Sequence, residues 1–115
     1  MDKDVITRGK LKLQVPFKSD TDEQIEELLY DFDRISGSML LSVLGDGDAN
    51  GKTGVTNRQA LELFFKACSP EDNAKMTANE MRQKLSAKDM PVAMRLGAAF
   101  FMNTYVSGLA NIGER

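Results

Sequence analysis

Strict alternation of apolar and polar side chains from Gly9 to Phe17 constrains the fold of this chain more than any other feature. A period of two predicts a half-buried β-strand, and Pro16 places it at a sheet edge or near the end of the strand. A single strand leaves its backbone groups unpaired, so the chain must supply a partner. The expected buried side is Leu11, Leu13, Val15 and Phe17, and the solvent side is Lys10, Lys12, Gln14 and Pro16.

The partner is sought in residues 24–32, QIEELLYDF, where two patterns compete. Thr21 and Gln24 have the spacing of a capping box, which would begin a short helix, and local propensity slightly favours that helix. Leu28, Tyr30 and Phe32 instead alternate as in a strand. Because the strand interpretation gives the first strand its antiparallel partner, we favour a hairpin.

Beyond residue 35 the apolar period becomes helical, and each expected helix has a start signal. These signals predict an α+β fold that is mainly α, with an N-terminal β-hairpin followed by about four helices. The start signals are Ser36 or Ser38 before MLLSVLG, the capping box Thr56 and Gln59 before NRQALELFFKAC, Ser69 before Pro70, and Thr77 with Glu80 before MRQKL.

The last expected helix, residues 90–106, is apolar on nearly every face and should be long. We expect it to begin near Asp89, because Pro91 is tolerated only in a first turn. It contains Arg95 and Asn103 and is shorter than the roughly 20 apolar residues that span a bilayer, so a membrane helix is not expected. A helix that is apolar all round is central to the core or has one face on a partner. Small residues at 93, 97 and 98 would let another helix approach closely, and large apolar ones at 100, 101, 102 and 105 would supply contacts.

Residues 45–56, GDGDANGKTGVT, resemble two known loops at once. Asp46, Asp48 and Asn50 fill the first, third and fifth positions of a calcium-binding EF-hand loop, but the twelfth is Asn57, which cannot give a bidentate carboxylate. A phosphate-binding P-loop needs four residues between its first glycine and GKT, and Asp46 stands at that position instead of glycine. The simplest interpretation is an exposed connection between helices, with a weak calcium site as the alternative.

The composition excludes several function classes. A net charge of −2 gives no field for nucleic acid, and the absence of histidine removes Ser-His-Asp and Cys-His arrangements. Cys68, the only cysteine, follows an apolar run and is expected to be a buried hydrophobe rather than a reactive thiol. We expect no enzymatic activity, no cofactor, and one domain over residues 9–107 between flexible ends at 1–8 and 108–115.

Two stretches, IEELLYDFDRISGSMLL and LSAKDMPVAMRLGAAFFM, resemble the small tail assembly chaperones of long-tailed bacteriophages and prophages. The opening strand GKLKLQVPF is similar as well, whereas the glycine-rich middle, residues 45–77, departs from the family pattern. The residues that carry the resemblance are Asp31, Phe32, Asp33, Ile35, Ser36 and Gly37, then Leu85, Ser86, Ala87, Lys88 and Asp89.

The resemblance implies a protein that binds the tape measure protein before the tail tube polymerises around it and helps to recruit tail tube subunits. Such a protein then dissociates from the assembling tail. It also implies location in the host bacterial cytoplasm during assembly and absence from the mature virion. Two alternatives remain, a small calcium-binding module and a structural tail completion or connector protein. Neither nucleic acid nor a membrane is expected as a partner, and a homo-oligomer is possible.

The seven methionines offer flexible apolar contacts of the kind a chaperone needs, although methionine also fills gaps in ordinary cores. Three of them lie on the expected last helix, whose all-round apolar character already indicates a partner-facing side. We therefore predict that the client surface lies on this helix. The predicted contact residues are Met90, Met94, Gly97, Phe101, Met102 and Tyr105.

Overall fold

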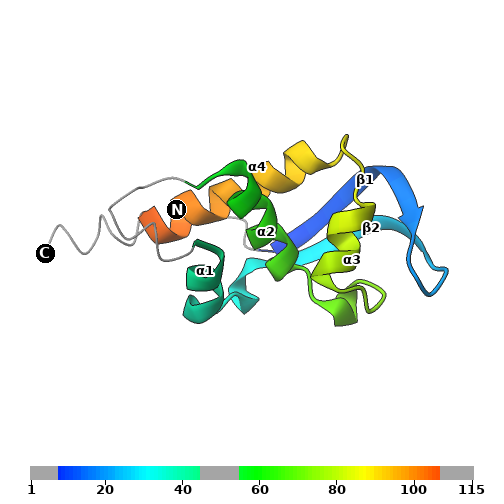
Figure 1. Cartoon of the computed structure of the whole chain (residues 1–115), viewed down its shortest axis with the longest axis horizontal. Coiled ribbons are helices and arrows are strands. Elements are labelled where there is room, and N and C mark those ends of the chain that lie inside the picture. The colour runs from blue at the N-terminus through cyan, green and yellow to red at the C-terminus, as the bar shows by residue number, and fades with distance from the viewer. Residues whose placement is uncertain (1–7, 45–54, 107–115) are drawn as a thin grey trace, which may run out of the picture.

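The computed structural model of the chain describes residues 8–44 and 55–106, and it contains a two-stranded hairpin followed by four α-helices (Figure 1). This order confirms the predicted hairpin and mainly helical remainder. The strands are β1 (Arg8–Lys18) and β2 (Gln24–Asp31), and the α-helices are α1 (Gly37–Leu44), α2 (Asn57–Ala67), α3 (Ala78–Lys84) and α4 (Met90–Phe100). Shorter turns are the 3-10 helices η2 (Phe32–Arg34) and η4 (Pro70–Asp72) and the π-helix η5 (Phe101–Val106).

The hairpin is antiparallel, and residues 24–31 form its second strand rather than the competing helix. Leu11 pairs with Leu28 on the inner face, while Lys12 pairs with Glu27 on the outer face. The pairing then slips: residues 13–16 lie between the paired Lys12 and Phe17, and residue 26 alone lies opposite them. This bulge ends the alternation, so the prediction that Val15 is buried is wrong, and its side chain is 39% exposed.

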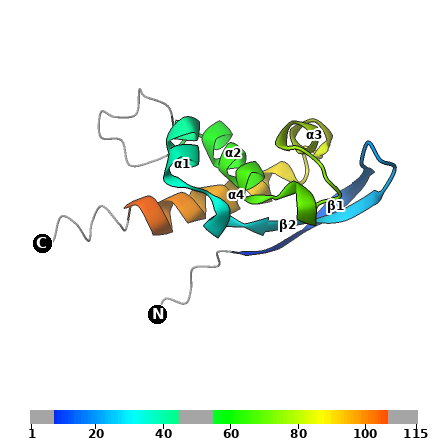
Figure 2. The ribbon, with the colours of Figure 1, turned by 90° about the horizontal axis from the view of Figure 1, so that it is seen from below.

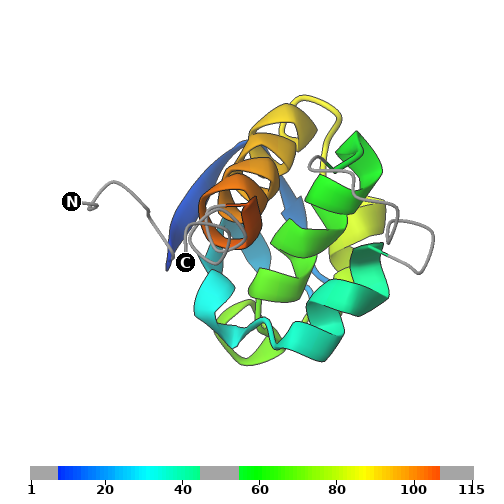
Figure 3. The ribbon, with the colours of Figure 1, turned by 90° about the vertical axis from the view of Figure 1, so that its left-hand side faces the viewer.

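α2 and α4 lie side by side against the hairpin, and α1 and α3 lie on either side of α2 (Figures 2 and 3). One core cluster joins the inner face of the hairpin to α2 and α4, where the ring of Tyr30 lies 5.6 Å from that of Phe64. A smaller cluster of Leu44, Leu63 and Phe101 joins α1, α2 and the end of α4. The two clusters make α2 and α4 the centre of the fold.

The prediction of a long, all-round apolar last helix is wrong. The α-helix α4 has 11 residues, and from Phe101 the backbone continues as a π-helix. Two adjacent aromatic side chains pack against different partners at this point, since the Phe100 ring stacks on Phe32 at 4.7 Å and Phe101 enters the smaller cluster. The solvent side of α4 carries Pro91, Arg95 and Ala99, so only part of its circumference is buried. No helix among the described residues is both long and apolar enough to span a bilayer.

Most of the predicted helix starts are found. Thr56 and Gln59 form the reciprocal capping box of α2, and Ser69 caps the single turn η4. Thr77 accepts a hydrogen bond from the backbone N–H of Glu80, which begins α3. The Glu80 carboxylate, however, accepts from the backbone N–H of Asp20 at 2.7 Å, so it ties α3 to the hairpin tip instead of completing a second box.

Candidate functional site

The first family-like segment, residues 31–37, forms the connection that holds α1 in place. The Asp31 carboxylate accepts from the backbone N–H of Asp33 at 3.0 Å and so caps η2. Ser36, one of the two predicted caps, accepts from the backbone N–H of Met39 at 3.2 Å and begins α1. Between them, buried Phe32 enters the core and the Arg34 guanidinium donates to the carbonyl of Lys66 at the end of α2.

The second family-like segment, residues 85–89, ends in a buried carboxylate. Asp89 is 1% exposed and begins α4, but its side chain does not cap that helix. Its two oxygens accept instead from the backbone N–H groups of Gln14 at 2.7 Å and Val15 at 3.1 Å. Asp89 therefore holds the bulge of β1, and Leu85 fills the core. Both family-like segments supply caps and anchors, which are structural roles.

The predicted contact residues on the last helix do not share one surface. Gly97 is buried and Phe101 is 1% exposed, so neither is open to a partner in this structure. Met90 and Met94 are half-buried against the main core, and Met102 is exposed. The Tyr105 side chain lies outside the described part of the chain. The close approach predicted at Gly97 is found, but the helix that approaches is α2 of the same chain, at Ala60.

The strongest exposed apolar feature lies on α1. Of its eight residues, GSMLLSVL, only Leu44 is buried, and Leu41 is 65% exposed. Met39, Leu40 and Val43 are half-buried, the last two against the smaller cluster. We call Met39, Leu40, Leu41 and Val43 the α1 face.

Sequence reasoning predicted α1 as a helix but assigned the client surface to α4. The signal for the α1 face was present, because five of its eight residues are apolar and such a short helix buries only one side. Methionine was also expected to fill gaps in the core, and Met76 and Met81, which are fully buried, do so.

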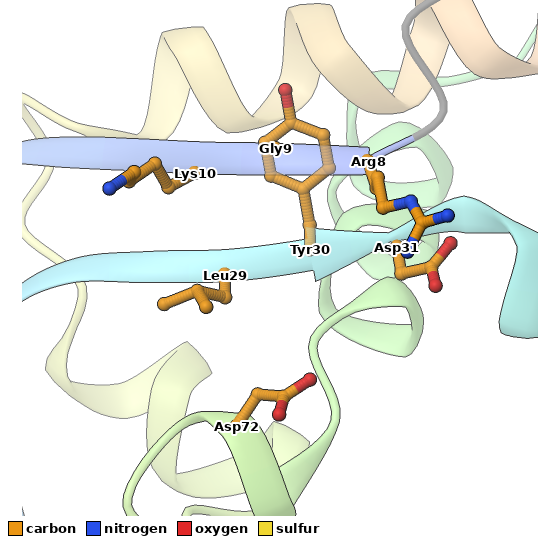
Figure 4. A pocket seen from close by; sticks show the side chains of 7 residues that line it. All are labelled: Arg8, Gly9, Lys10, Leu29, Tyr30, Asp31 and Asp72. Atoms are coloured by element: carbon orange, nitrogen blue, oxygen red, sulfur yellow. The ribbon is translucent and has the colours of Figure 1, made fainter.

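A shallow hollow of about 350 Å³ lies along the hairpin (Figure 4). Its floor is formed where the Tyr30 ring crosses Gly9, since a Cβ on Gly9 would lie 2.9 Å from the Tyr30 hydroxyl oxygen. Arg8 and Asp31 face each other across the two strands at one end, and Asp72 approaches from η4. Among the described residues that line this hollow, no hydrogen bond joins the Tyr30 hydroxyl to the carboxylate of Asp31 or Asp72.

The thiol of Cys68 is buried, as predicted, at the end of α2. Burial raises its pKa from 9.0 to about 12, so the thiol is protonated at neutral pH. Among the described residues no cluster of three or more acidic, cysteine or histidine side chains could hold a metal ion. The calcium candidates Asp46, Asp48 and Asn50 lie outside the described residues.

Comparison of the chain with protein-family models, with curated proteins and with solved structures gives no match. The resemblance to tail assembly chaperones thus remains a prediction from residues 9–107.

Proposed function

We propose that this chain is a non-enzymatic tail assembly chaperone that binds the tape measure protein through the α1 face and aids recruitment of tail tube subunits. The observation that carries the proposal is an apolar helix with one buried residue, Leu44, and a leucine that is 65% exposed. Exposed apolar patches of this kind mark protein-binding sites. A helical client would bury its own apolar stripe on such a face.

The position of the α1 face supports its assignment. The family-like segment 31–37 runs directly into α1, and Ser36 forms its cap. Arg34 fixes the same segment to the end of α2. Residues that resemble the family therefore present the α1 face on a rigid base, which lowers the entropic cost of binding.

Co-expression with the tape measure protein tests the proposal. We expect the client to be soluble and to co-purify with this chain, and to aggregate when the chain is absent. Leu41→Ser should weaken the complex about tenfold, because losing the burial of a leucine costs about 1.5 kcal/mol.

The matched control is Leu29→Ser on the outer face of the hairpin, where the leucine is 40% exposed. This control should leave client binding unchanged. Equal solubility of the client with and without the chain, and no co-purification, would refute the proposal. Mass spectrometry of purified virions separates the connector alternative, since a chaperone is absent from the particle and a connector is present at fixed copy number.

A further inference from the structure

The two outer edges of the hairpin differ in which of their outward backbone groups are hydrogen-bonded by side chains. On β2 the side chain of Asn73 covers the middle of the edge, because its Oδ1 accepts from the Leu29 N–H at 2.8 Å and its Nδ2 donates to the Leu29 carbonyl at 3.0 Å. Asn73 is buried and also donates to the carbonyl of Ser69. One side chain thus occupies the place of a neighbouring strand, which is how proteins protect exposed edges.

On β1 only the second half of the edge is closed, by the Asp89 carboxylate on Gln14 and Val15. Lys10 pairs directly with Leu29, and directly opposed residues of antiparallel strands turn their backbone groups either both inward or both outward. Since the Leu29 groups point outward to Asn73, those of Lys10 point outward on the β1 side. Arg8 and Lys12, two residues away on either side, share this orientation.

No described side chain bonds to the backbone of Arg8, Lys10 or Lys12. Seen along the molecule in Figure 3, the start of β1 forms the outer margin of the layers, with β2 and α4 on its inner sides. We call residues 8–13 the open edge. Its outer face is basic at every second position, with Arg8, Lys10 and Lys12, and its inner face carries Leu11 and Leu13.

We propose that the open edge binds an extended segment of another protein in which acidic and apolar residues alternate. The strand already paired with β1 matches this chemistry at two of the three basic positions: Asp31 lies opposite Arg8 and Glu27 opposite Lys12, while Leu29 lies opposite Lys10. The Lys10 ammonium instead pairs with the neighbouring Glu27 carboxylate at 3.7 Å, and on the inner face Leu28 lies opposite Leu11. A strand added on the other side meets the same side chains of β1, so the same pattern complements it.

A second copy of this chain is a poor occupant of the open edge. Antiparallel pairing of two β1 strands would set Arg8, Lys10 and Lys12 against the same three basic residues of the other copy. Like charges directly opposite one another destabilise a strand pair. The lysines thus discourage self-association and select an acidic segment. This site is separate from the α1 face, and either proposal can fail without the other.

Amide hydrogen exchange of the full chain tests the proposal, with a short synthetic peptide in which glutamate alternates with valine as the probe. At a peptide concentration about ten times its dissociation constant, exchange of the Lys10 and Lys12 amides should slow by about tenfold. A peptide with lysine in place of glutamate should leave their exchange unchanged. The double variant Lys10→Glu and Lys12→Glu should reverse this preference.

Lys10→Pro removes the outward N–H while Gly9 and Leu11 keep their bonds to β2, and it should abolish the protection at Lys12. Its matched control, Lys10→Ala, keeps the N–H and should still bind. Equal effects of the two peptides, or no protection with either, would overturn the proposal. Protection that grows with protein concentration in the absence of peptide would instead identify a second copy as the occupant, and would also overturn it. The charge-reversed variant keeps the test decisive if Lys10→Pro does not fold.

Discussion

Gly97→Ala tests the packing of α4 on α2 at the centre of the fold. A Cβ at position 97 would lie 1.9 Å from the carbonyl oxygen and 2.8 Å from the carbonyl carbon of Ala60. Both atoms are backbone, so no side-chain rotation relieves the contact. Since real Cβ contacts essentially never fall below 3.0 Å, the backbone of α4 or of α2 must shift to make room.

The expected loss follows from two opposing effects. Replacing glycine by alanine inside a helix gains about 1 kcal/mol from conformational entropy. Against this gain, separating the two helices by about 0.5–1 Å forfeits roughly a quarter to a half of the dispersion energy of the atoms that face each other, and this loss is part of the cost of overpacking. Overpacking of a tight core costs about 1–3 kcal/mol and occasionally more, and a clash between two backbones belongs at the upper end. We expect a net destabilisation of about 2 kcal/mol after the helix gain is subtracted.

Chemical denaturation measures this loss, and Gly37→Ala is the matched control. A Cβ on Gly37, in the first turn of α1, would meet nothing within 4 Å, so this variant should be neutral or slightly more stable. For a chain of this size, about 2 kcal/mol corresponds to a melting temperature roughly 6–12 °C lower. If Gly97→Ala were as stable as the wild type, the described contact between α4 and α2 would be wrong.

Three further outcomes are expected. Asp89→Asn should lower the free energy of unfolding by about 2–3 kcal/mol, because both N–H groups lose a charged acceptor and one of them then faces an amide NH2 group that cannot accept. Faster exchange of the Gln14 and Val15 amides would locate that loss at the bulge, and unchanged exchange would contradict it. Asn73→Ala should cost about 2 kcal/mol and promote association through the β2 edge, which light scattering detects. The Cys68 thiol ionises near pH 9.0 in the unfolded chain and near 12 in the folded one. The unfolded state therefore loses this proton first, and the contribution of Cys68 to stability is complete below pH 9 and is lost between about 9 and 12. Relative to Cys68→Ala, the wild type should lose stability across that range in denaturant titrations, and a constant difference would contradict the assigned burial.

The features that sequence predicted well are set by neighbours in the chain. The Thr56–Gln59 capping box, the Ser36 cap and the change from strand to helical period all depend on residues within four positions of one another. The hairpin needed one step more, the requirement that a strand have a partner, and that requirement correctly outweighed the helix signal at Thr21.

The features that sequence missed are set at long range. The bulge that exposes Val15 is held by Asp89, which is 74 residues away in the chain. The length of α4 is limited where Phe100 and Phe101 pack against different partners, Phe32 and Leu63, that come from distant segments. The sequence predicted that another helix approaches Gly97 closely. It could not identify that helix as α2, because the contact with Ala60 depends on the tertiary packing. For the candidate binding surface, the sequence predicted that α1 is a helix but did not predict that its apolar face is exposed.

Hydrogen exchange of this chain, alone and in complex with the tape measure protein, tests the central claim most directly. The α1 face predicts protection concentrated in residues 37–44, with little change along the solvent side of α4 around Arg95. The Leu41→Ser variant should lose that protection, while Leu29→Ser should keep it. Protection confined to α4, or a complex that forms with exchange of α1 unchanged, would contradict the account.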